Sequence, residues 1–211
     1  MVSGLIIGYD PGGNDAHGVA ELRVKDGVPI SLETWTEACA DDVMQRVEHA
    51  QPLIALGVDT LTCWSSGTSG WRPADRWLKS RYPGVQNSVV TPNGLYGSMG
   101  LNGMAVLIEA RRLQPGLVIT ETHPKVLHWY LSKGIKYNYK NEHARMDDLL
   151  AAIFGIDVTP NNEHEWDAAI SASAALEGLC GRWTHELHSL PTSGEERLIW
   201  PCGKTHYYWP E

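Results

Sequence analysis

The sequence predicts a single α/β domain, residues 1–211, in which a mixed five-stranded sheet is flanked by helices. Two apolar runs, residues 5–10 and 53–59, have the length of buried strands, and each run ends in an aspartate. Residues 18–24 and 30–38 alternate between apolar and polar side chains, as strands with one buried face do. Helical patterns alternate with strands further along the chain, which is typical of a sheet with parallel crossovers.

The first three strands are expected to form an antiparallel meander, because residues 11–15 are rich in turn-forming Pro, Gly, Asn and Asp. Another strand is expected at residues 117–121, where an apolar run ends in a glutamate. Residues 60–70 are rich in Ser, Thr and Gly and are expected to form a loop. The tail from residue 184 is expected to be irregular, with one strand near residues 198–200. The expected helices span residues 40–50, 73–82, 98–114, 124–132, 143–155 and 162–179.

The net charge of −8 counts against strong binding of a nucleic-acid backbone, since such binders normally carry a basic surface. The charge is uneven, however, because the stretch from Arg111 to Arg145 holds seven basic residues and two acids. We expect this stretch to contact the phosphates of DNA or RNA, with a solvated helix face as the alternative. A second basic stretch lies at residues 72–81 and has the same two interpretations. The seven basic residues are Arg111, Arg112, Lys125, Lys133, Lys136, Lys140 and Arg145.

The cysteines and the hydropathy indicate a cytoplasmic protein. The four cysteines are widely spaced and form no C-x-x-C pair, which favours free thiols in a reducing compartment over disulfides or a zinc ribbon. No apolar stretch approaches the ~18 residues of a membrane span, so no membrane partner is expected. The N-terminus also lacks the basic head of a secretory signal. The oligomeric state is left open.

Acidic residues end three of the predicted strands: Asp10, Asp59 and Glu121. Sites in open α/β sheets lie at the carboxyl ends of strands, and neighbouring strands are only ~4.8 Å apart. A fourth acid, Asp167, lies on an amphipathic helix that we expect to pack on the sheet. Crowded carboxylates favour a cation between them, and oxygen ligands suit Mg²⁺ or Mn²⁺ rather than Zn²⁺. We therefore expect these four acids to bind metal, with one or two ions as open alternatives.

Each candidate also has a structural interpretation. Asp10 precedes Pro-Gly-Gly and could form a turn, Glu121 could cap a helix or pair with Lys125, and Asp167 could be stabilised by a helix dipole. His123 has the position of a general base or of a group that orients a ligand, yet a histidine at a helix start is usually structural. Asp59 is the hardest to explain structurally, because ending a buried strand in an unpaired charge is costly.

The motifs around these acids resemble those of a known group of nucleases. The segment Ile7 to Gly13 is similar to the first strand of RuvC-type resolvases and other RNase H-like nucleases. More closely, the whole chain resembles a bacterial family that is catalogued as a domain of unknown function and predicted to be RNase H-like nucleases. The resemblance implies the RNase H-like fold and a metal-dependent phosphodiesterase site. The matching pieces are Gly8-Tyr9-Asp10, Val58-Asp59-Thr60, Glu121-Thr122-His123-Pro124-Lys125 and Trp166-Asp167-Ala168-Ala169.

Two departures from the pattern of related nucleases leave the number of metal ions open. A proline-containing loop is expected after Asp59, but the chain continues with residues 60–64, Thr-Leu-Thr-Cys-Trp. The helix of Asp167 carries a single acid at that turn, where related nucleases often have two.

The leading functional hypothesis is a nuclease or phosphodiesterase that depends on Mg²⁺ or Mn²⁺, with Asp10, Asp59, Glu121, Asp167 and His123 as its site residues. The alternative is a non-catalytic RNase H-like module that binds a nucleotide, a nucleic acid or a protein. An actin-like kinase would need two such domains to enclose ATP, and 211 residues are too few.

Overall fold

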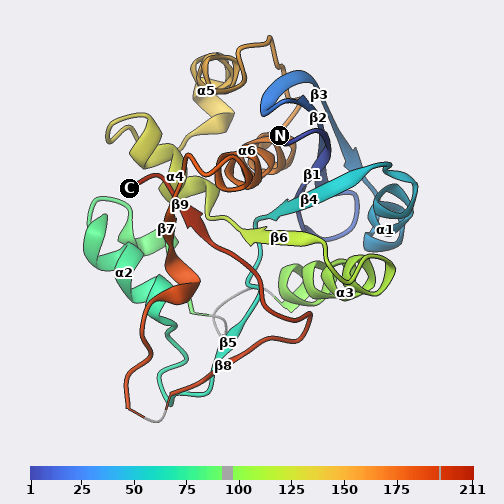
Figure 1. Ribbon diagram of the computed structural model, residues 1–211. Coiled ribbons are helices and arrows are strands. Elements are labelled where there is room, and N and C mark those ends of the chain that lie inside the picture. Colours follow the sequence, from blue (N-terminus) through green and yellow to red (C-terminus); the bar gives the residue numbers. More distant parts are fainter. Residues whose placement is uncertain (92–96, 195) are drawn as a thin grey trace.

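A mixed sheet of five strands forms the centre of the fold, and helices cover both of its faces (Figure 1). The computed structural model describes residues 1–91, 97–194 and 196–211. The strands are β1 (Gly4–Asp10), β2 (His17–Lys25), β3 (Val28–Glu37), β4 (Leu53–Val58) and β6 (Val118–Glu121). Their order is β3-β2-β1-β4-β6, with β1, β2 and β3 antiparallel and β1, β4 and β6 parallel. The mixed five-stranded sheet flanked by helices is therefore confirmed.

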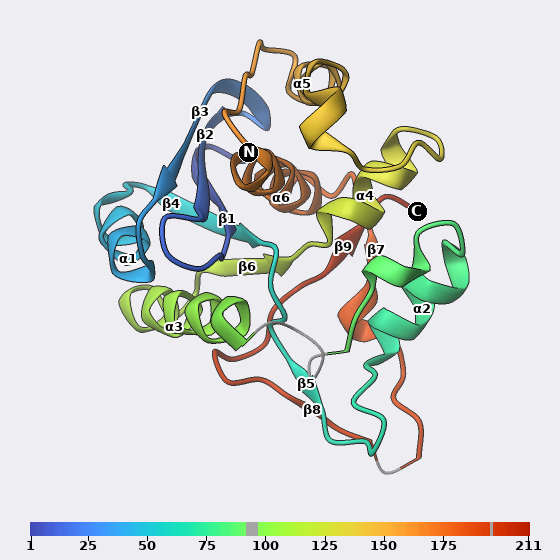
Figure 2. The same cartoon turned by 180° about the vertical axis from the view of Figure 1, so that it is seen from behind.

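The two faces of the sheet are covered by different helices. Helix α6 (Glu163–Leu179) lies across one face, whereas α1 (Ala40–His49) and α3 (Gly97–Leu113) lie together on the other (Figure 1 and Figure 2). Successive side chains of a strand point to opposite faces, so β1 supplies Ile6 to the core under α6 and Ile7 to the core under α1 and α3.

The remaining elements surround this centre. The predicted loop at residues 60–70 contains a short strand, and the tail forms three short strands where the sequence predicted one, because they pair with one another and with that loop strand. None of the helices in the described part of the chain is long and apolar enough to span a membrane. The elements that surround the central sheet are α2 (Pro73–Arg81), α4 (Pro124–Leu131), α5 (Tyr139–Phe154), β5 (Trp64–Ser65), β7 (His185–Glu186), β8 (Leu198–Ile199), β9 (Tyr208–Trp209), and the 3-10 turns η1 (Gln86–Ser88) and η3 (Leu187–Ser189).

The predicted helix at residues 143–155 starts earlier than expected. α5 begins at Tyr139 and is broken at Glu142, whose φ of −136° and ψ of 28° are not helical. The apolar periodicity of residues 143–155 predicted only the section of α5 that follows the break at Glu142.

Helix α6 approaches the sheet so closely that glycine is required on the strands beneath it. A Cβ at Gly8 would lie 1.9 Å from the carbonyl oxygen of Ala168, and a Cβ at Gly57 would lie 1.9 Å from that of Ser171. The helix allows this approach because its buried residues are largely Ala and Ser, whose side chains are short. The backbone of α6 is thereby held against β1 and β4, so its polar residues have fixed places above the strand ends.

Candidate active site

Asp10 and Asp59 lie at the carboxyl ends of two neighbouring parallel strands. Asp10 is the last residue of β1, and Asp59 follows Val58, the last residue of β4. Tyr9 pairs with Val58 in the ladder, and the backbone N–H of Asp59 donates to the carbonyl oxygen of Tyr9 at 2.9 Å. The expectation that these aspartates end adjacent parallel strands is confirmed.

Helix α6 brings a third aspartate, Asp167, to the same place. The negative charges of Asp10 and Asp59 raise the pKa of its carboxyl group. The hydroxyl of Tyr137 donates to its Oδ1 at 2.8 Å. Asp10 and Asp167 are only 3% and 5% exposed, while Asp59 is partly buried. The structure thus gathers three of the four predicted acids, from β1, from the end of β4 and from α6.

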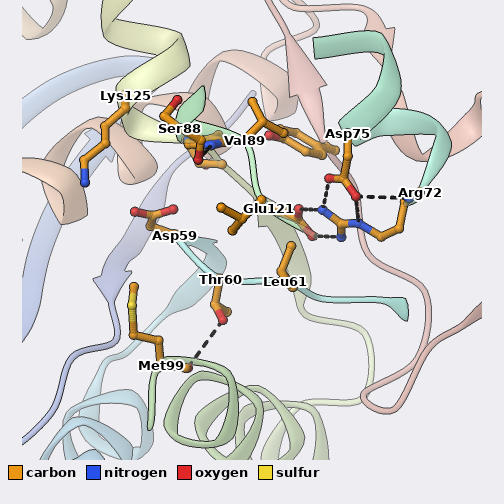
Figure 3. A pocket seen from close by; sticks show the side chains of 14 residues that line it. Asp59, Thr60, Leu61, Arg72, Asp75, Ser88, Val89, Met99, Glu121 and Lys125 are labelled. Atoms are coloured by element: carbon orange, nitrogen blue, oxygen red, sulfur yellow. Dashed lines mark hydrogen bonds and ion pairs between the residues drawn. The ribbon is translucent and has the colours of Figure 1, made fainter. Parts of the chain in front are cut away.

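Burial raises the pKa of each of these three carboxyl groups, and repulsion by neighbouring carboxylates adds to it. For Asp59 and Asp167 burial is the larger cause, and the negative charge of Asp10 adds to it. Burial also raises the pKa of Asp10, against the opposing effect of His164. The ammonium group of Lys125 lowers the pKa of all three, and Figure 3 shows it on the side of Asp59 that faces away from Arg72. Three such acids ionise together only when positive charge compensates them.

His164 is a site residue that the sequence interpretation missed. Its ring Nδ1 lies 2.6 Å from Oδ2 of Asp10, and this hydrogen bond raises the pKa of the imidazole. The sequence does contain a signal, because His164 and Asp167 are three positions apart on one helix and therefore share a face. The face of α6 that carries Asp167 thus carries a histidine as well, one turn before it.

Glu121 is engaged by Arg72, although its charge also acts on Asp59, and its role as a metal ligand stays a prediction. Its two oxygens accept hydrogen bonds from Arg72 at 2.6 and 2.8 Å (Figure 3). The backbone N–H of Thr62 also donates to one of them at 2.8 Å. Burial opposes the charge of Glu121, but the guanidinium of Arg72 holds the pKa of this carboxyl well below its usual range. Both oxygens are engaged in this way because Arg72, from the second basic stretch, is itself buried between Glu121 and Asp75.

His123 lies beside the aspartates but has no hydrogen bond to them among the described residues. Its Nε2 is 3.1 Å from the carbonyl oxygen of Ser88, so Nε2 carries the proton and Nδ1 is an acceptor. Burial lowers the pKa of this imidazole to about 4, so the ring is neutral at pH 7. His123 lines a cavity of about 220 Å³ that also contacts Asp59 and Lys125; we call it the Asp59 cavity.

The basic residues from Arg111 to Arg145 do not form one surface, which corrects the expectation from the sequence. Arg111 donates to four backbone carbonyl groups, and Arg112 and Arg145 each pair with a glutamate of their own helix. A groove of about 500 Å³ runs beside Tyr137 and Ser88. We call it the lysine groove, and the lysines that line it are Lys125, Lys136 and Lys140.

The donor set fits a hard divalent cation in its chemistry. Carboxylate oxygens are the ligands that Mg²⁺ and Mn²⁺ prefer, and three crowded aspartates supply them. As the side chains stand, however, no group of three or more His, Cys, Asp or Glu residues in the described ranges could hold a metal ion. Lys125 and His164 are the basic groups that face the acids instead. Side-chain rotation would have to bring the carboxylates onto one ion.

No family model and no curated protein matches the chain. Among solved structures, the chain is similar to RuvC of Thermus thermophilus, alone and in complex with a Holliday junction substrate. The sequence identities are 17% and 18%, the TM-scores are 0.45 and 0.46, and in both cases 84% of this chain and 96% of the RuvC chain are covered. The strand order β3-β2-β1-β4-β6, with helices on both faces, gives the mixed five-stranded α/β architecture expected from the sequence.

Proposed function

We propose that the protein is a phosphodiesterase that cleaves nucleic acid with the help of Mg²⁺ or Mn²⁺. The observation that carries this proposal is the group Asp10, Asp59 and Asp167, three aspartates that separate elements bring to one place, where burial raises the pKa of each. Holding three acids together in this way costs stability, and a bound cation would remove that cost. Such strained acids are typical of sites with a chemical task.

The three aspartates would hold the cation, which when bound would lower the pKa of a water and stabilise negative charge on the leaving oxygen. His164 is placed to move a proton, because its Nδ1 is engaged by Asp10 and its ring is 35% exposed, so Nε2 is available. Tyr137 fixes Asp167 through its hydroxyl. Lys125 provides a positive charge for the phosphate at the mouth of the site.

The proposed substrate class is nucleic acid because the lysine groove begins at the same place. Lys125 and Tyr137 belong to both the groove and the surroundings of the aspartates. Exposed lysines along a groove bind a phosphate backbone by releasing its counterions. Lys136 and Lys140 lie further along the groove, and both are exposed.

A non-catalytic module that binds nucleic acid is the second candidate. It is favoured by the way in which Lys125, His164 and Tyr137 already compensate the three aspartates without a metal ion. In a module of this kind the aspartates would only orient these groups. The two candidates differ in whether a metal is needed for activity.

The purified protein should be tested with Mn²⁺ on bis(p-nitrophenyl) phosphate and on single-stranded, duplex, junction and hybrid nucleic acids. We expect cleavage that a chelator abolishes and that Asp59→Asn lowers by about 100-fold or more, since even groups that merely orient metal ligands contribute about 10–100-fold. Asp157→Asn is the matched control, because Asp157 is exposed and is not one of the three clustered aspartates, and it should retain full activity. If no substrate is cut, or if Asp59→Asn cuts equally well, the non-catalytic module is the better account.

A further inference from the structure

The Asp59 cavity has the properties of a binding site for an uncharged ring. Its walls are largely apolar and include Leu61, Val89 and Met99 (Figure 3). Its volume of about 220 Å³ equals that of roughly seven waters at about 30 Å³ each, which is enough for one ring system and too little for a larger ligand.

The charged groups at the far end of the cavity cannot attract an anion. Arg72 has five N–H donors, and all of them are engaged by Asp75, Glu121 and the carbonyl oxygen of Cys63. The two carboxylates share this one guanidinium, so the three groups have no positive charge to spare. A phosphate or a free carboxylate would therefore lose its hydration at this end of the cavity and gain no partner there.

Two polar atoms of residues in the cavity wall have no hydrogen-bond partner among the described residues. They are Oγ1 of Thr122, a residue that is 4% exposed, and Nδ1 of His123. The His123 atom is an acceptor, because its other ring nitrogen donates to Ser88, and a hydroxyl both donates and accepts. Nucleobase edges carry both the donors and the acceptors that these two atoms lack, and the buried side chains would have to turn toward the cavity to meet them.

We propose that the Asp59 cavity takes one unstacked nucleobase of the strand whose phosphodiester lies at the three aspartates. This inference rests on the proposed function, and it adds that the substrate must present an unpaired nucleotide there. The cavity and the lysine groove are neighbours, since Lys125 and Ser88 line both. A strand that follows the groove therefore passes beside the cavity, whose lining includes Asp59.

The consequence is a preference for single strands, bulges or loops over a continuous duplex. A paired base must leave its stack before it can enter, and the energy for this is lowest where the base is already unpaired. Apolar contact with a base face is tolerant of sequence, so the preference is for an unpaired nucleotide rather than for one particular base.

The test measures binding without catalysis. A fluorescently labelled hexamer of deoxyadenosine and a hexamer of the same length with abasic sugars are titrated with the protein in EDTA. The deoxyadenosine hexamer should bind at least tenfold more tightly, and a duplex should bind more weakly than the same duplex with one bulged adenosine. Equal affinity for the two hexamers, or no binding of either, would overturn the base site.

Variants that fill the cavity locate the effect. Met99→Trp and Val90→Trp place a large ring at two different positions of the cavity lining, so one of them remains informative if the other fails to fold. Each should reduce binding of the deoxyadenosine hexamer to that of the abasic one. Leu101→Trp is the matched control, because Leu101 is 74% exposed on α3 and does not line the cavity, and it should keep the tenfold difference. A cavity-filling variant that folds and still prefers the base also overturns the inference.

The proposed function has its own readout in the hydrolysis of bis(p-nitrophenyl) phosphate, which has no base. If this diester is hydrolysed while the two hexamers bind equally, the phosphodiesterase stands and the base site is wrong. If the diester is not hydrolysed while the protein binds the deoxyadenosine hexamer more tightly than the abasic one, the base site is supported and the phosphodiesterase activity is not.

Discussion

Arg72 and Glu121 form a buried bidentate ion pair, with Nη2 2.6 Å from Oε1 and Nη1 2.8 Å from Oε2. Both side chains are almost fully buried, at 1% and 3% exposure, and Asp75 shares the same guanidinium. Removing one partner of such a pair leaves the other charge in an apolar setting without compensation, and that is far more costly than the loss of an exposed pair.

Arg72→Met should therefore lower the free energy of unfolding by about 3–5 kcal/mol. Denaturant unfolding measures this directly. The matched control is Arg76→Met, whose pairing with Glu196 is 41% exposed on the arginine side and whose loss should cost about 1 kcal/mol or less. If the two variants are equally stable, Arg72 is not the support that the buried network indicates.

Asp147 should make stability depend on pH near neutrality. Burial raises its pKa from 3.8 to about 6, and its Oδ1 is buried without a partner in the described part of the chain. A carboxyl with a raised pKa in the folded state favours folding while it is protonated, so this contribution is lost as pH rises from about 4 through 6. Asp147→Asn should melt at a higher temperature than the wild type at pH 7.5 and at nearly the same temperature at pH 3.5.

The neighbouring Asp148 supplies the control for this experiment, because it is exposed. Asp148→Asn should change the pH dependence of melting much less than Asp147→Asn does, because the charge of Asp148 is the smallest of the causes that act on the pKa of Asp147. A difference between Asp147→Asn and the wild type that stays constant from pH 3.5 to 7.5 would show that Asp147 titrates like an ordinary surface acid.

Lys125 should have opposite effects on metal and on nucleic acid. Its positive charge faces the three aspartates, so it competes with a cation there, but the same charge attracts phosphate. Lys125→Met should bind Mn²⁺ severalfold more tightly at low salt, since an exposed charge at short range contributes about 1 kcal/mol. It should bind single-stranded DNA more weakly. Lys133→Met is the control, and equal shifts in the two variants would contradict this role of Lys125.

The lysine groove should determine how strongly binding depends on salt. The double variant Lys136→Gln, Lys140→Gln removes two charges of the groove, and for single strands each lost phosphate contact should flatten the slope of log affinity against log salt by about 0.7. Fluorescence anisotropy between 50 and 200 mM salt measures the slope. Lys25→Gln, at an exposed position of β2, is the control and should leave this slope unaltered. A double variant with the wild-type slope would show that the lysine groove does not contact the phosphates.

Asp10 and Asp59 could be predicted from sequence because the signal is local. An apolar strand that ends in a charge needs a reason, and two such strands in a parallel sheet end at the same edge. Glu121 showed the same local pattern, but its charge is compensated by Arg72, which lies in a distant segment of the chain. A pairing of that kind is made by the tertiary fold, and no periodicity in the sequence indicates it.

The same distinction applies to the basic residues and to His164. Sequence proximity grouped Arg111 with Lys136, whereas the fold turns Arg111 onto backbone carbonyl groups and leaves Lys136 in the groove. The spacing of His164 and Asp167 could have been used, because helical geometry puts them on one face. That spacing indicates a site only if α6 is known to lie over the end of β1. The close contacts between α6 and the glycines of the sheet hold the helix there.

Asp10, Asp59 and Asp167 are proposed to bind one divalent cation together. Calorimetric titration of the purified protein with Mn²⁺, after removal of all metal, tests this proposal most directly, with Asp59→Asn and the control Asp157→Asn measured in parallel. We expect saturable Mn²⁺ binding to the wild type and to Asp157→Asn, and an affinity at least tenfold lower in Asp59→Asn. In EDTA the melting temperature of Asp59→Asn should be equal to or above that of the wild type, because the variant lacks one of the repelling charges. A wild-type protein that takes up no Mn²⁺ at millimolar concentration, or an Asp59→Asn protein that binds it equally well, would contradict the account.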